Sequence, residues 1–142
     1  MAGITVSVDI DAPVATVWRD VADLASHTEW MADAETIEYL DEHREGVGTV
    51  MRVMTRVGPL RTADIIEVTE WNPPSSIGVV HRGAIGGTGT FTLASSGAGT
   101  SFTWTETLSF PWWLGGLLAE LLARPVLRAI WRRNLRRFRD RF

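Results

Sequence analysis

The segment of residues 100–110, TSFTWTETLSF, constrains the fold most, because its side chains alternate strictly between two kinds. One set is large and mainly apolar: Thr100, Phe102, Trp104, Glu106, Leu108 and Phe110. The other set contains only serine and threonine. Successive side chains of a strand point to opposite faces, so this pattern predicts a strand with one face in water and the other against a large apolar interior.

A long apolar helix is predicted directly after this strand. Its stripe consists of Leu114, Leu117, Leu118, Leu121, Leu122, Val126, Ile130, Leu135 and Phe138. A helix over 114–138 extends about 37 Å, enough to cross a small domain. Pro125 removes a backbone donor inside it and predicts a kink or a break. The pair Trp112-Trp113, just before two glycines, is compatible with a mobile flap or with the corner where the helix docks.

The rest of the chain predicts six further strands and two short helices. Residues 4–10, ITVSVDI, alternate as a half-buried strand, and residues 14–24 repeat apolar side chains at helical spacing. A second short helix is predicted to end at Trp30. Turn signals then divide residues 34–110 into six runs suited to a meander of hairpins. We therefore expect a single α+β domain over residues 1–142, with a curved seven-stranded antiparallel sheet around the long C-terminal helix.

Charge is distributed unevenly along the sequence. The net charge is −3, all fourteen basic residues are arginine, and eight of them lie between Arg124 and Arg141. This block is compatible with contact to nucleic acid or an anionic membrane, or with the solvated face of a helix that finds acidic partners within the molecule. The acidic remainder of the chain argues against nucleic acid, whereas weak contact with an anionic membrane stays open. No secretory signal is recognisable at the N-terminus, so we expect a cytoplasmic protein.

Four segments in this order resemble the START-like superfamily, which has the helix-grip fold of polyketide cyclase/dehydratase-like proteins. They are IDAPVATVWRDVADLASHTEWM, VGTVMRV, EVTEWNPPSSI and GAGTSFTW. The resemblance covers essentially the whole chain. It implies an apolar ligand, such as a lipid or polyketide, held between the sheet and the C-terminal helix, and in some members cyclisation or dehydration there.

Strand alternation then predicts which side chains face the expected cavity. The expected ligand-binding residues on the strands are Met51, Val53, Ile66, Val79, Phe91, Phe102, Trp104 and Leu108. Trp113, Leu117 and Leu121, just before and on the C-terminal helix, are expected to contact the ligand from the other side. Three ionisable residues fall on the same face, namely Asp64, His81 and Glu106. Burying a carboxylate is costly unless it has a partner, which makes Glu106 the sharpest anomaly among them. We expect these three to be catalytic acid/base residues or to bind a polar group of the ligand, while Glu106 could instead pair with an arginine of the C-terminal helix or lie at the cavity rim in water.

Several chemistries have no signal in this sequence. There is no cysteine or lysine, the three histidines are scattered, and GAIGGTG does not open a helix as a dinucleotide-binding loop does. We therefore expect no cofactor and no metal. Three functions stay open: binding of a hydrophobic small molecule, a polyketide cyclase/dehydratase-type enzyme, and a peripheral membrane protein acting through the arginine-rich helix. The ligand and the oligomeric state are not predictable from these residues.

Overall fold

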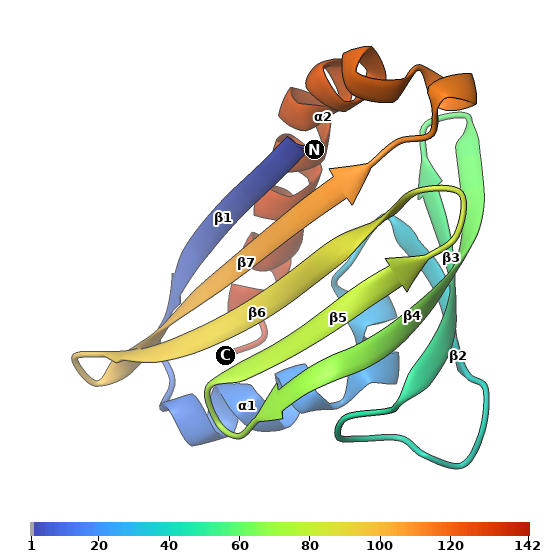
Figure 1. Cartoon of the computed structure of the whole chain (residues 1–142). Coiled ribbons are helices and arrows are strands. Elements are labelled where there is room, and N and C mark those ends of the chain that lie inside the picture. Colours follow the sequence, from blue (N-terminus) through green and yellow to red (C-terminus); the bar gives the residue numbers. More distant parts are fainter. Residues whose placement is uncertain (1) are drawn as a thin grey trace.

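Seven antiparallel strands form one curved sheet that wraps around a long C-terminal helix (Figure 1). The computed structural model describes residues 2–142. The strand order across the sheet is β1-β7-β6-β5-β4-β3-β2. The strands are β1 (Ala2–Ile10), β2 (Ala34–Tyr39), β3 (Val50–Val57), β4 (Leu60–Asn72), β5 (Ser76–Arg82), β6 (Gly86–Ser96) and β7 (Gly99–Ser109). The predicted strand after the N-terminus and the six strands of the meander are thus confirmed.

Short helical segments connect the first two strands. They are α1 (Val14–Ala22) and the 3₁₀ helix η1 (Leu24–Glu29). The helical spacing in α1 buries Val17 and Val21 completely. Both segments pack at the end of the sheet that contains the C-terminal end of β1 (Figure 1), and they close that end of the molecule.

The C-terminal helix begins later than its apolar stripe indicated. A 3₁₀ turn, η2 (Trp112–Leu114), precedes α2 (Gly116–Arg139). Gly115 separates the two with a φ of 99°, a left-handed conformation that side chains with a Cβ rarely adopt. Pro125 lies inside α2 without ending it. In Figure 1 the first turns of α2 cross the end of the sheet and the remainder turns to run along the concave face, as expected of a proline kink.

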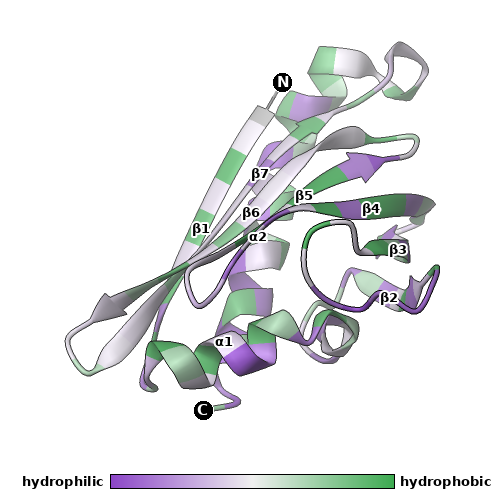
Figure 2. Ribbon diagram, turned by 60° about the horizontal axis from the view of Figure 1, so that its bottom comes forward, coloured by the Kyte–Doolittle hydropathy of each residue, from purple (hydrophilic) through white to green (hydrophobic). Residues whose placement is uncertain are grey.

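The outer faces of β1 and β7 are small and polar, as the alternation predicted. The two strands pair in register from Ala2 opposite Leu108 to Ile10 opposite Thr100. On the outer face, hydroxyl groups of facing residues approach one another, with 3.3 Å between the Oγ1 atoms of Thr5 and Thr105. Figure 2 shows the same alternation of hydrophobic and weakly polar residues along β1. The apolar face of these strands is therefore committed to the interior.

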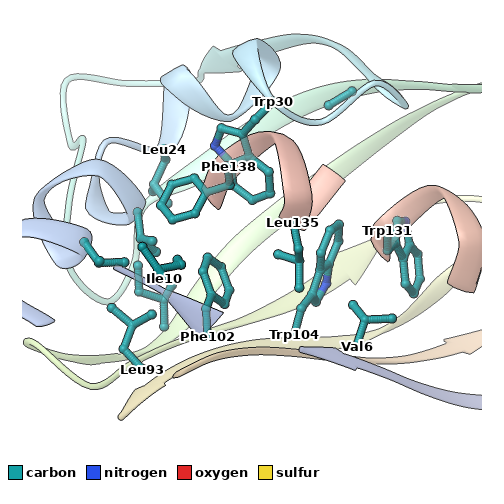
Figure 3. Packing of buried hydrophobic residues seen from close by; sticks show 14 of the residues in the cluster. Val6, Ile10, Leu24, Trp30, Leu93, Phe102, Trp104, Trp131, Leu135 and Phe138 are labelled. Carbon is teal, nitrogen blue, oxygen red and sulfur yellow. The ribbon is translucent and has the colours of Figure 1, made fainter. Parts of the chain in front are cut away.

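Aromatic side chains build the core between the concave face and the second half of α2 (Figure 3). Trp30 is 1% exposed, and its ring centroid lies 5.0 Å from that of Phe138 and 6.3 Å from that of Phe102. Trp131 of α2 stacks on Trp104 of β7 with 4.9 Å between centroids. These contacts fix the second half of α2 on the sheet.

Polar bonds add a second attachment of α2. Asp33, between η1 and β2, accepts hydrogen bonds from Trp131 Nε1 at 3.1 Å and from Asn134 Nδ2 at 2.7 Å. Asn134 Oδ1 in turn accepts from the Ala32 amide at 3.0 Å. Arg141 forms ion pairs with Asp20 and Glu29. The C-terminal end of the helix is consequently tied to the connection between β1 and β2.

The placement of α2 determines where the molecule is hollow. Along its length the helix packs mainly on β1 and only slightly on β7. The concave faces of β3, β4 and β5 therefore lack a helix directly above them, although they carry apolar side chains.

None of the helices formed by residues 2–142 is long and apolar enough to cross a membrane.

Candidate functional site

A cavity of about 550 Å³ lies between the concave face of the sheet and α2. Its wall is formed by residues from η1, by β2 to β7, and by the part of α2 from Ala119 to Trp131. Most of the lining side chains are apolar. This volume lies within the range of about 300–1,000 Å³ that is usual for small-molecule sites.

Most of the residues predicted to face the interior lie on this wall. They are Met51, Val53, Asp64, Ile66, Val79, His81, Phe91, Trp104, Glu106 and Leu108. They come from β3, β4, β5, β6 and β7. The pairing of these strands places on one wall residues that lie up to 57 positions apart in the sequence, as Met51 and Leu108 do. The structure thus gathers all three predicted ionisable residues in one cavity.

Four predicted residues lie elsewhere. Phe102 is fully buried and packs on Phe91 and Phe138, so it belongs to the core beside the cavity. Trp113, Leu117 and Leu121 are 60%, 68% and 60% exposed and do not line the cavity. The prediction failed there because the apolar stripe of α2 extends around too much of the helix to reveal which side faces inward.

The cavity side of α2 carries other residues than those predicted, and two of them are alanines. They are Ala119, Leu122, Ala123, Val126, Leu127 and Trp131. They recur as 119, 122/123, 126/127 and 131, at intervals of three and four residues, which places them on one helix face. The two alanines were the available signal, because short side chains on an inward face leave room for a guest. The remaining missed residues, such as Leu24 and Met31 from the η1 region, follow from tertiary packing alone.

Glu106 is held by two donors inside the cavity. Its Oε2 atom lies 2.8 Å from His81 Nε2, and its Oε1 atom accepts a hydrogen bond of 3.1 Å from Trp104 Nε1. Glu106 is 7% exposed. An arginine of α2 was one possible partner, but the partners are a histidine and a tryptophan of the sheet. Both carboxylate oxygens are therefore engaged, which offsets the cost of burying this group.

Two glycines provide the room that the carboxylates occupy. Gly89 of β6 faces Glu106 across the β6–β7 pair. A Cβ at position 89 would lie 2.5 Å from Glu106 Oε1, which is closer than real contacts of this kind. A Cβ at Gly83 would collide in the same way with Asp64 Oδ1. Gly83 in the β5–β6 turn and Gly89 in β6 thus shape the polar part of the cavity wall.

Asp64 is the least satisfied of the three ionisable groups. It is 8% exposed, and its Oδ1 atom has no hydrogen-bond partner within residues 2–142. Burial raises the pKa of Asp64 above its usual value, and the charge of His81 and a hydrogen bond from Thr62 only partly oppose this. An orphaned buried oxygen is costly, so Asp64 offers an unused acceptor, or a donor when protonated, to a guest in the cavity.

The charge state of His81 depends on its two acidic neighbours. Burial alone would lower the pKa of its imidazole, but the hydrogen bond to Glu106 and the negative charges of Glu106 and Asp64 raise it above the usual value. His81 is therefore biased toward the protonated form. In that form both ring nitrogens are donors, and one of them is already bonded to Glu106.

A second histidine of the wall has the opposite bias. His27 of η1 is 5% exposed, and its burial lowers its pKa to about 4. Its Nε2 atom lies 2.8 Å from the Val21 carbonyl oxygen, so the neutral ring donates its proton there. The ring also packs on Trp30 and Phe91. His27 is thus an uncharged part of the cavity wall near η1.

The two regions of the cavity differ in chemistry. Asp64, His81 and Glu106 lie beside the β5–β6 turn, whereas the part near η1 is bounded mainly by apolar and aromatic side chains. Asp33 also lies on the wall there, and both of its carboxylate oxygens accept hydrogen bonds from α2, from Trp131 and from Asn134. The arrangement suits a molecule with an apolar body and one hydrogen-bonding group, and it also places proton donors and acceptors next to that group. Within residues 2–142 no three histidine or acidic side chains are arranged to hold a metal ion.

A curved sheet gripping a C-terminal helix over an apolar cavity defines the helix-grip class of proteins. Residues 1–142 match the model of the family described as polyketide cyclase/dehydrase and lipid transport. The chain therefore belongs to that family, and the START-like resemblance is confirmed. No curated protein sequence matches the chain closely enough to count as a relative.

Solved structures show the same fold at low sequence identity. The protein TTHA0849 from Thermus thermophilus superposes with a TM-score of 0.82 at 21% identity, covering 99% of this chain and 96% of that one. A START superfamily protein from Mycobacterium smegmatis gives 0.78 at 13% identity, covering 98% and 95%. The di-domain ARO/CYC BexL, from the BE-7585A biosynthetic pathway, gives 0.74 at 20% identity, covering 98% of this chain and 49% of its own.

Proposed function

We propose that this protein binds a hydrophobic small molecule that carries a hydrogen-bonding group at one end. The observation that carries the proposal is the apolar cavity of about 550 Å³ with three ionisable side chains gathered beside one turn. The apolar body of the ligand would lie against Met51, Phe91 and Trp104. Its polar group would meet Asp64 Oδ1 and the free ring nitrogen of His81. The family description, which includes lipid transport, supports this class of ligand.

The proposal can be tested by titration with Nile red, a neutral apolar dye whose fluorescence rises in apolar sites. Ala123→Trp places a large side chain in the cavity, because Ala123 lies on its wall. Ala129→Trp is the matched control, since Ala129 lies six residues further along α2 and is exposed. The wild type and Ala129→Trp should bind the dye equally, and Ala123→Trp should bind at least about tenfold more weakly. Equal binding by all three proteins would contradict the proposal.

A second candidate is acid–base catalysis on the bound molecule, and the 2.8 Å contact between His81 and Glu106 favours it. On a β-hydroxy ketone, one group would remove the proton beside the carbonyl and another would protonate the leaving hydroxyl, releasing water. The BexL neighbour supports this class of chemistry only through its name and fold. The reaction would appear as growing absorbance of the conjugated ketone. His81→Asn should abolish it while Nile red still binds, and turnover unaffected by this change would exclude the candidate.

A further inference from the structure

A group of large apolar side chains lies exposed on η2 and the first half of α2. The group, called here the helix patch, consists of Trp112, Trp113, Leu117, Leu118, Leu121 and Leu122. Each is at least 60% exposed, and Trp112 reaches 88%. Residues 117, 118, 121 and 122 fall on one side of the helix, because positions three to five apart lie close together on its surface. Contiguous exposed apolar groups of this kind mark an interaction surface.

The helix patch adjoins the open side of the cavity. Leu122 is 67% exposed and also lines the cavity, and Val126, one turn further, is 51% exposed and lines it as well. Across the opening, Leu60 in the β3–β4 hairpin is 43% exposed and lines the cavity too. Figure 1 shows that hairpin at the same end of the molecule as η2. Whatever covers the helix patch therefore also faces the entrance.

Positive charge follows the helix patch along the same helix. Residues 110–139 contain seven arginines and a single acid, Glu120. Glu120 is 5% exposed, and its Oε1 atom accepts a hydrogen bond of 2.8 Å from the Phe110 amide. Arg124 and Arg128, the arginines nearest the helix patch in sequence, form no ion pair with any residue of the described range 2–142. Their Nε atoms are buried there without a hydrogen-bond partner.

These features favour a membrane surface over a second copy of the chain as the occupant. A symmetric dimer through the helix patch would bring two arginine-rich helices together with only buried acids between them. At a membrane interface, by contrast, tryptophan lies at the level of the headgroups and leucine reaches the acyl boundary. Arginines beside the apolar group then face anionic phosphates, where each contributes favourably.

We propose that the helix patch docks on the surface of a membrane that contains anionic phospholipids. Trp112, Trp113 and the exposed leucines enter the interface, and Arg124 and Arg128 contact phosphate groups. Docking in this orientation brings Leu122 and Val126, at the cavity entrance, against the bilayer. An apolar ligand then passes between membrane and cavity without crossing water; this last step rests on the function proposed above, whereas the docking itself does not.

Vesicle flotation of the full chain tests the docking. The probes are vesicles of phosphatidylcholine alone and vesicles of phosphatidylcholine with phosphatidylglycerol. The wild type should float with the anionic vesicles and much less with the neutral ones. Binding should fall as salt rises from about 0.1 M to about 1 M, where the screening length shrinks from about 10 Å to about 3 Å.

Two variants separate the apolar and the charged contributions. The double change Trp112→Ala/Leu118→Gln removes apolar surface outside the cavity and should weaken partitioning by about tenfold or more. Arg124→Gln/Arg128→Gln should weaken it by a similar factor, and only with anionic vesicles. The matched control is Leu40→Gln/Val47→Gln, which changes two exposed apolar residues in the connection between β2 and β3, at the opposite end of the molecule from η2 (Figure 1). This control should bind like the wild type.

The outcomes distinguish docking from ligand binding. Without vesicles, Trp112→Ala/Leu118→Gln should bind Nile red as the wild type does, whereas Ala123→Trp should still float with anionic vesicles. A wild type that floats with anionic vesicles but does not bind Nile red would overturn the ligand proposal without affecting the docking proposal. Absence of wild-type flotation, or patch variants that float like the wild type, would overturn the docking. So would gel filtration showing a dimer that Trp112→Ala/Leu118→Gln dissociates, since a second copy would then cover the helix patch.

Discussion

Removing the charge of Glu106 tests how the polar part of the cavity is held together. Glu106→Gln keeps the shape of the side chain and leaves an oxygen that accepts from Trp104 Nε1. It replaces the carboxylate oxygen that lies 2.8 Å from His81 Nε2 by a neutral amide. The corresponding change on the other partner is His81→Gln. Together with the double variant these proteins form a thermodynamic cycle that isolates the pair.

The size of the effect follows from burial and charge. The side chains of His81 and Glu106 are only 14% and 9% exposed, so solvent screens their interaction weakly. A hydrogen bond that involves a charged partner contributes about 1.5–3 kcal/mol to stability, and a neutral one about 0.5–1.5 kcal/mol. We therefore expect a coupling energy of about 1.5–3 kcal/mol while His81 is protonated. It should decline once the ring loses its proton, because the attraction between two opposite charges is then lost and only a hydrogen bond to the carboxylate remains.

The contribution of the pair to stability should fall as the pH rises. The folded protein raises the pKa of His81 above the unfolded value of 6.5. The extra stability is then fully present below about pH 6.5 and is lost as the pH rises through the higher folded value. Urea denaturation of the four proteins at about pH 6 and about pH 9 measures the coupling energy at both ends. A coupling energy that is absent at the lower pH, or that grows at the higher pH, would show that His81 and Glu106 do not form this ion pair.

Two further predictions concern His27 in the cavity wall and Leu135 in the core. Burial lowers the pKa of His27 to about 4. As the pH falls from about 6.5 to about 4, the free energy of unfolding of the wild type should therefore drop by up to about 3 kcal/mol relative to that of His27→Gln. Parallel curves of unfolding free energy against pH for the two proteins would show that the buried ring is not neutral. Leu135 is 0% exposed, so Leu135→Ala leaves a cavity in the core and should lower the free energy of unfolding by about 2–5 kcal/mol in urea denaturation. Leu118→Ala at an exposed site should lower it by less than about 0.5 kcal/mol. Equal losses in the two variants would contradict the described packing of α2.

The fold was predictable because its signals are periodic. Strict alternation in residues 100–110 fixed which face of β7 is inside, and turn residues marked the ends of the six strands of the meander. Alternation also placed Asp64, His81 and Glu106 on one face before any contact between them was known. Strand periodicity of two is hard to misread, since a slip of one residue would expose the whole apolar set.

The helix side of the site was not predictable in the same way. Leucines surround the first half of α2, so sequence periodicity could not separate Leu117 and Leu121, which face outward, from Leu122 and Val126, which line the cavity. The partner of Glu106 was also open, because it depends on the register that sets Gly89 opposite Glu106 and leaves space for His81 to reach across. Such contacts arise from tertiary packing and have no local signal.

The position of an apolar molecule bound in the cavity under α2 can be measured directly. Nuclear Overhauser effects between bound Nile red and methyl groups of the protein report contacts of a few ångströms. If the ligand binds there, contacts are expected to Val53, Ile66 and Val79, which line the cavity, and these contacts should be lost in Ala123→Trp. Contacts only to Leu117, Leu118 and Leu121 on the outer surface of the helix would contradict binding in the cavity.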